Sequence, residues 1–186
     1  AVNSSLLAQH IAPILIHDRS AGDIIISEDE TLHQKKAGEM LPYADGAACM
    51  ITVDESALKR LQVRPLAKIT SVATAACAPI QRWRGAVLAV QKICEKEQLP
   101  VDMIVFDAES VPTMMALQDE FTKMGFSAEC QNPLGSCAAF GVNESASGIR
   151  LIGSLLIALR RSGLRRGIAA SAAASGQGVA LMVENI

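Results

Sequence analysis

The chain has 186 residues, of which 50% are hydrophobic and 19% are charged, and its formal net charge at pH 7 is -2. That length allows a single domain with one substantial core. A charge so close to zero excludes the strongly basic surface that is typical of proteins that bind nucleic acid or anionic membranes. We therefore expect neither nucleic acid nor a membrane among the partners of this protein.

The five cysteines are widely spaced and lie mostly in apolar runs, a pattern typical of reduced thiols. The longest apolar stretch, residues 151–159, is flanked by Arg150, Arg160 and Arg161 and is too short to span a membrane. These features predict a soluble protein in the reducing environment of the cytoplasm.

The first 44 residues differ in character from the rest of the chain. Two short β-like runs, residues 13–17 and 24–27, flank a turn, and a charged stretch follows at residues 28–36. We interpret residues 1–44 as an accessory segment and residues 45–186 as the main domain. That domain is expected to open with a buried strand at residues 47–53 and a short helix that begins after Asp54.

The next elements alternate between strand and helix patterns. Strands are predicted at residues 66–76 and 102–107, and amphipathic helices at 83–97 and 111–124. A helix at residues 145–162 is apolar on nearly every side, which predicts burial on all sides. Two strands then follow, at residues 167–174 and 179–185, joined by a glycine-containing turn. This alternation favours a layered α/β fold.

Several motifs in a fixed order carry a resemblance to a known family. They are Ala37-Gly38 with residues 45–48 (Asp-Gly-Ala-Ala), the strand at 66–69, the strand at 102–106, the loop at 132–141, Ala146-Ser-Gly-Ile-Arg150, and Gly176-Gln-Gly178. The order resembles the second half of a thiolase, an enzyme about twice this long with two similar α/β halves and a nucleophilic cysteine in the first. The resemblance implies a thiolase-like layered α/β fold, with a mixed five-stranded sheet, helices on both faces and a buried helix at residues 145–162.

The resemblance also shows where the family's functional side chains would fall. The family's histidine falls on Val142, its second cysteine on Ala172 and its oxyanion-hole asparagine on Asp107. Neither Val nor Ala can transfer a proton, and a carboxylate would repel a developing oxyanion.

Two loops offer four weak candidates for cofactor binding. The asparagine and serine of the family's coenzyme A loop correspond to Glu39 and Leu41, and the loop before the last strand contributes Ser175 and Gly176. We expect no tightly bound cofactor, and a coenzyme A thioester is the candidate ligand.

Other polar residues have both a functional and a structural interpretation. Cys137 is a candidate nucleophile, but we favour a small buried thiol that fills space. Asp107, Glu109 and Glu144 would form an acid–base group if their loops met, but a solvated rim is the simpler interpretation.

The remaining charged residues and histidines are assigned structural roles. The arginines that follow the long helix are expected to cap its C-terminal end rather than to bind a coenzyme phosphate; they are Arg160, Arg161, Arg165 and Arg166. The three histidines, His10, His17 and His33, have irregular spacing, and we predict no metal site.

Two functional hypotheses follow from the resemblance. The first is a degenerate thiolase-like domain without autonomous activity that serves as a structural or acyl-CoA-related binding partner. The alternative is the C-terminal portion of an acyl-CoA acyltransferase whose nucleophile lies in a missing N-terminal half or on a partner chain. In either case the apolar long helix requires a cover, from a second copy in a homodimer or from an N-terminal half.

Overall fold

The computed structural model describes residues 10–11, 41, 43–143, 145–173 and 175–186. Its strands are β1 (His10–Ile11), β2 (Thr52–Val53), β3 (Ala67–Ala76), β4 (Met103–Phe106), β5 (Arg166–Ala172) and β6 (Gln177–Asn185). Its α-helices are α2 (Glu55–Leu61), α3 (Arg84–Glu97), α4 (Val111–Lys123), α5 (Cys137–Phe140) and α6 (Ser147–Ser162). Two short 3-10 helices, Pro79–Gln81 and Ala128–Cys130, precede α3 and α5.

The strands form one mixed sheet in the order β2-β1-β3-β6-β5-β4. Only β4 and β5 pair in parallel, and the other neighbours are antiparallel. The layered α/β fold with a mixed sheet is therefore confirmed, but the expected number of strands is wrong. Four long strands make up the body of the sheet, and two-residue strands extend it to six.

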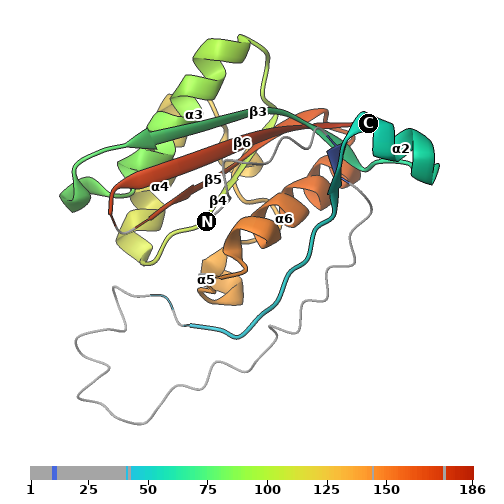
Figure 1. Ribbon diagram of the computed structural model, residues 1–186. Helices are drawn as coiled ribbons and strands as arrows, with labels where there is room; N and C mark the ends of the chain where they lie inside the picture. The colour runs from blue at the N-terminus through green and yellow to red at the C-terminus, as the bar shows by residue number, and fades with distance from the viewer. Residues whose placement is uncertain (1–9, 12–40, 42, 144, 174) are drawn as a thin grey trace.

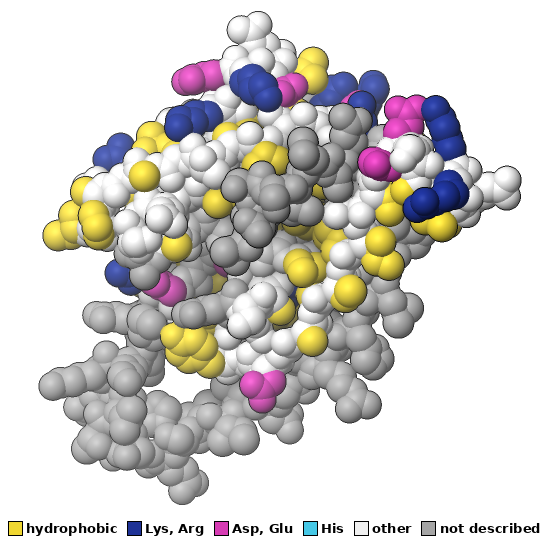
Figure 2. Space-filling model, viewed as in Figure 1, with side chains coloured by type: hydrophobic (Ala, Val, Ile, Leu, Met, Phe, Trp, Pro, Cys, Tyr) yellow, Lys and Arg dark blue, Asp and Glu magenta, His cyan; other side chains and the backbone are white. Residues whose placement is uncertain are grey.

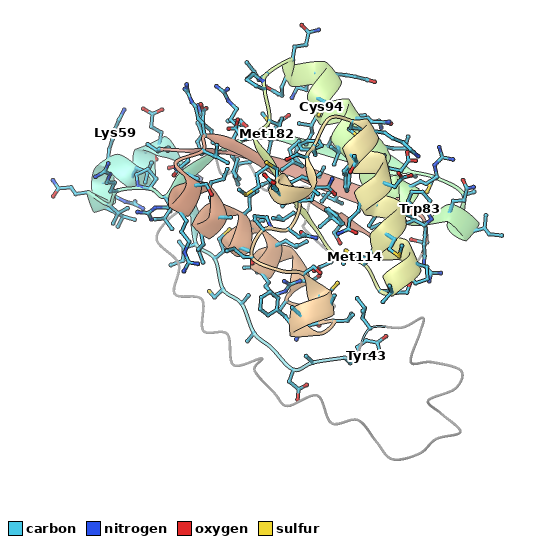
Figure 3. The ribbon with its side chains drawn as sticks, turned by 180° about the vertical axis from the view of Figure 1, so that it is seen from behind. Tyr43, Lys59, Trp83, Cys94, Met114 and Met182 are labelled. Carbon is cyan, nitrogen blue, oxygen red and sulfur yellow. The ribbon has the colours of Figure 1, made fainter. Side chains whose placement is uncertain are left out.

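Helices cover both faces of the sheet, as predicted (Figure 1). On one face α3 and α4 pack against Ile168, Ala170 and Met182. On the other face α6 packs against alternate residues of the same strands, among them Ala169 and Leu181. Figure 3 shows Met182 within the sheet, with Cys94, Trp83 and Met114 on the side of α3 and α4.

The helix α6 is not buried on all sides, which corrects the sequence-based expectation. Leu155 and Leu159 are fully buried against the sheet, whereas Ile157 on the outer face is 40% exposed. The helix ends at Gly163, whose φ of 65° gives the left-handed C-cap. Because α6 packs on the sheet along one face, its outer apolar residues have no equivalent layer among the described residues.

The expected buried strand at residues 47–53 is also wrong. Only β2 at its end is a strand, and Ile51 is 58% exposed. The segment before β2 runs alongside α5 and α6 (Figure 1), where the Asn143 side chain donates to the carbonyls of Ala44 and Gly46 at 3.2 and 3.0 Å. An apolar run that lacks a neighbouring strand cannot form a ladder, whatever its propensity.

Figure 2 shows a band of hydrophobic side chains over α6 and the segment before β2, with charged side chains gathered over α2. Exposed hydrophobic residues of these two elements are Ile51, in the segment before β2, and Ile157, on α6. None of the helices in the described part of the chain is long and apolar enough to cross a membrane. The predicted accessory runs at residues 13–17 and 24–27, with His17 and His33, lie outside the described residues.

Candidate active site

The carboxyl ends of β3, β4 and β5 lie at the same edge of the sheet, where residues predicted from the motifs to occupy functional positions are found. Leu41, Cys137, Val142 and Ala172 all pack in the hydrophobic cluster on the α3 side. Asp107 follows β4 directly, and Ala172 is the last residue of β5. The structure thus brings together positions that are more than a hundred residues apart in the sequence.

The side chains at two of these positions offer no proton-transfer chemistry. Val142 forms an isolated bridge with Tyr43, and its carbonyl accepts from the Ala44 N–H at 3.0 Å. Ala172 is half-buried against the same cluster. Both positions are occupied by hydrocarbon side chains that contribute packing.

Cys137 lies at the start of α5 and is buried. Its thiol donates to the Ala108 carbonyl at 2.8 Å and accepts from the Ala108 N–H at 3.3 Å. Burial, followed by the nearby negative charge of Asp107, raises the pKa of this thiol to about 11. Such surroundings disfavour the thiolate, which is the nucleophilic form.

Asp107, the residue predicted at the oxyanion-hole position, forms an ion pair with an arginine. Its Oδ2 is paired with Nη2 of Arg150, and its Oδ1 accepts from the Cys137 N–H at 3.3 Å. Both side chains of the ion pair are 13% exposed. The guanidinium also lies over the Phe140 ring, 5.6 Å from its centroid. The carboxylate is thus neutralised by an arginine from α6.

The predicted carboxylate group of Asp107, Glu109 and Glu144 does not form among the described residues. Glu109 pairs with Arg82 instead, whose Nε donates to Oε1 at 2.5 Å. Glu144 lies outside the described residues. Asp107 and Glu109 are thus held by different arginines and do not form a carboxylate pair.

Four residues were candidates for holding coenzyme A. The Leu41 side chain is buried in the core, and its N–H donates to the Glu109 carbonyl at 3.1 Å. Ser175 is exposed, whereas Gly176 is buried with a φ of 87°. Glu39 lies outside the described residues. Of the three that are described, only Ser175 presents a side chain that a ligand can reach.

The glycines of the last hairpin are held by packing against the start of α3. A Cβ on Gly178 would lie 1.9 Å from the carbonyl carbon of Gly85, and one on Gly176 would lie 2.3 Å from the Cys77 carbonyl oxygen. Backbone therefore contacts backbone at this end of the sheet. The glycine motif has a structural reason to remain even where the neighbouring chemistry has changed.

The arginines expected to cap α6 fall into two groups. Arg160 and Arg161 lie in its last turn, as expected. Arg165 and Arg166 instead pair with Glu184 of β6 across the sheet edge. In the described part of the chain there is no group of three His, Cys, Asp or Glu side chains that could hold a metal ion.

Comparisons with known proteins agree with the motifs at this edge of the sheet. A family profile described as "Thiolase, C-terminal domain" matches residues 63–185. The chain belongs to the thiolase family. The boundary at residue 45 stays a prediction, since the profile match begins later.

Two relatives of this thiolase-family chain show how much of a thiolase it covers. The beta-ketoadipyl-CoA thiolase of Pseudomonas aeruginosa is 28% identical, over 100% of this chain and 51% of the relative. The acetyl-CoA acetyltransferase of Allochromatium vinosum is 30% identical, over 81% of this chain and 38% of the relative. The chain thus spans about half the length of the relatives that it matches.

Solved structures give the same assignment. Human mitochondrial 3-ketoacyl-CoA thiolase is similar with a TM-score of 0.75 and 26% identity, over 81% of this chain and 38% of that one. Another structure of the human enzyme is a complex with CoA, with the same TM-score.

Sequence reasoning missed the roles of Arg150 and Arg82. A signal for Arg150 was present, because it closes the Ala146-Ser-Gly-Ile-Arg150 motif on a helix that is otherwise apolar there. A charged residue at such a position requires a partner of opposite charge. Asp107, at the end of the predicted strand 102–107, was a carboxylate without a predicted cationic partner.

Proposed function

We propose that this chain is a thiolase-type C-terminal half that does not catalyse thiolysis or condensation by itself. It serves as a structural or acyl-CoA-related binding partner. The observation that carries the proposal is the pair Val142 and Ala172, which replace the acid–base groups of the family with hydrocarbon at the edge where the functional positions meet. General acid–base catalysis contributes roughly 10²–10⁴-fold in rate, and neither position retains it.

Two further contacts support the proposal. Burial and the nearby negative charge of Asp107 raise the pKa of the Cys137 thiol to about 11, so the thiol is neutral at pH 7. The Asp107 carboxylate is bound to Arg150 and cannot act as a free base. Among the described residues Cys77 donates only to backbone carbonyls, those of Gln81, Arg82 and Gly176, and burial raises the pKa of the Cys94 thiol.

The direct test is a thiolysis assay of the purified chain with acetoacetyl-CoA and coenzyme A. We expect no turnover above the uncatalysed rate. Turnover that rises in proportion to the concentration of the chain would remove the proposal. Titration calorimetry with acetyl-CoA separates the two roles, because measurable binding supports the acyl-CoA role and no heat leaves the structural one.

The proposed partner covers the outer face of α6, either as a second copy of this chain or as an N-terminal half. Ile157 on α6 and Ile51 in the segment before β2 are exposed in the isolated chain, and Figure 2 shows a band of hydrophobic side chains over these two elements. Exposed apolar surface of this kind is typical of protein interfaces. Native mass spectrometry of the protein from its source distinguishes a dimer from a heterologous complex, and a lone monomer contradicts both.

A second candidate function is favoured by the coverage of the relatives. Because the chain matches about half of each relative, it could be the C-terminal portion of an acyl-CoA acyltransferase whose nucleophilic cysteine lies in an N-terminal half. Incubation of the complete assembly with acetyl-CoA should then leave an acyl group on a cysteine outside this chain. Failure to trap such a species by mass spectrometry would exclude this candidate.

A further inference from the structure

Arg150 has more hydrogen-bonding capacity than its known partners use. Its Nη2 is paired with Asp107, and the Phe140 ring covers the guanidinium. Its Nε and Nη1 are buried and have no hydrogen-bond partner among the described residues. Buried donors of a charged group are rarely left unpaired, because the cost of desolvation is then not compensated.

A small cavity adjoins this arginine. It has a volume of about 30 Å³ and lies between the segment before β2 and the start of α6. Small and apolar groups dominate its lining, which includes Ala44, Ala48, Ala146 and Phe140, together with the polar residues Asp45, Asn143 and Arg150. The volume corresponds to on the order of two water-sized atoms, which is enough for a carbonyl group.

The charges around the cavity decide which acceptor it favours. The positive charge of Arg150 is already balanced by Asp107, and a second carboxylate, Asp45, lines the cavity. An anionic ligand would therefore meet a neutral ion pair and a like charge. An uncharged oxygen acceptor gains the hydrogen bond without that repulsion.

We infer that the Arg150 cavity binds the carbonyl oxygen of an uncharged amide or thioester group, which accepts a hydrogen bond from Nε or Nη1. The alanines hold the carbon atoms that flank the carbonyl. Phe140 and Asp107 keep the guanidinium in place, so little side-chain entropy is lost on binding. The inference rests on the proposed acyl-CoA-related role and assigns a residue and an atom to it.

The same kind of unpaired donor occurs at Arg166 and provides a matched control. Arg166 is 14% exposed, is paired with Glu184 and has a buried Nε without a partner. It does not line the cavity. Arg150→Lys and Arg166→Lys each keep the positive charge and remove guanidinium donors, but only the first change affects the cavity.

The test is a titration followed by NMR of the arginine Nε–H signals, assigned through correlations to each backbone. The probes are S-acetyl-N-acetylcysteamine, which carries a thioester and an amide, acetamide, and sodium acetate. We expect a saturable shift of the Arg150 Nε–H signal with an uncharged probe and none with acetate. Binding to the variants is followed through the backbone amide signals of the residues that line the cavity. Arg150→Lys should weaken it about tenfold or more, as expected for one hydrogen bond from a charged donor, and Arg166→Lys should leave it unchanged.

Three results would overturn the inference. They are no saturable shift with either uncharged probe, equal binding of acetate, or binding that persists in Arg150→Lys. Because the wild-type signal is observed directly, the inference stays testable even if Arg150→Lys fails to fold. If acetamide binds and the thioester probe does not, the carbonyl site stands and only the acyl-CoA role is refuted. Turnover in the thiolysis assay would refute the proposed function without affecting this site.

Discussion

Gly178 at the start of β6 packs directly on Gly85 at the start of α3, and replacing it with alanine tests this contact. The new Cβ would lie 1.9 Å from the Gly85 carbonyl carbon, 2.0 Å from its oxygen and 2.4 Å from the Ala86 nitrogen. All three atoms belong to the backbone, so no side-chain rotation relieves the overlap. The helix and the hairpin must separate.

The magnitude follows from the cost of overpacking. Added methyl groups in packed interiors cost roughly 1–3 kcal/mol, and we place Gly178→Ala near the top of that range, about 3 kcal/mol. For a chain of this size each kcal/mol lowers Tm by roughly 2–4 °C, which predicts a fall of roughly 6–12 °C. Thermal unfolding followed by circular dichroism measures it.

Gly46→Ala is the control for this experiment. A Cβ there would lie 3.2 Å from Nδ2 of Asn143, a side-chain atom that can move. We expect a change within about 0.5 kcal/mol, as for most surface substitutions. If Gly178→Ala melts within about 2 °C of the parent protein, the close approach of α3 and the hairpin is wrong.

Three further predictions concern the core and the former catalytic edge. Leu155→Ala should lower the free energy of unfolding, measured by urea titration, by about 2–5 kcal/mol, because Leu155 is fully buried. Ile157→Ala, on the outer face of α6, should lower it by less than about 1 kcal/mol in the isolated chain. Equal effects of the two substitutions would contradict the described faces of α6. Cys137 should react with iodoacetamide more slowly than the exposed Cys49, because burial raises the pKa of its thiol from 9.0 to about 11. Fast alkylation of Cys137 in the native protein at pH 8 would be incompatible with this environment. The raised pKa also stabilises the fold below pH 9, and this contribution is lost as pH rises through about 11. Asp107→Ala should destabilise the chain by about 3 kcal/mol, because it leaves the nearly buried charge of Arg150 without its partner. An unchanged denaturation midpoint would argue against the ion pair.

The long helices and strands were predictable because their hydrophobic period agrees with their tertiary environment. β3, α3, α4 and β6 begin within two residues of the expected positions. The predicted strand at residues 47–53 failed because a strand depends on a neighbour as well as on propensity, and only β2 has one. The outer face of α6 was misjudged because composition alone does not reveal how many layers surround a helix.

The motif order predicts which residues stand at the family's functional positions, Val142, Ala172 and Asp107, but it does not predict their contacts. In the structure Asp107 follows β4 and Ala172 ends the neighbouring strand β5, and Val142 packs in the same cluster as Ala172. The pairing of Asp107 with Arg150 depends on the distance between the end of β4 and the start of α6. That distance is set by packing across the whole domain, which no local sequence pattern encodes.

The most direct test of the central claim is intact-mass spectrometry of the purified chain after incubation with acetyl-CoA. The five cysteines are all unpaired, so each is available as an acyl acceptor in principle. The account predicts no stoichiometric acylation, since burial and the charge of Asp107 keep the Cys137 thiol protonated. A single acetyl group on Cys137, removed by free coenzyme A, would contradict the account and establish that this half carries its own nucleophile.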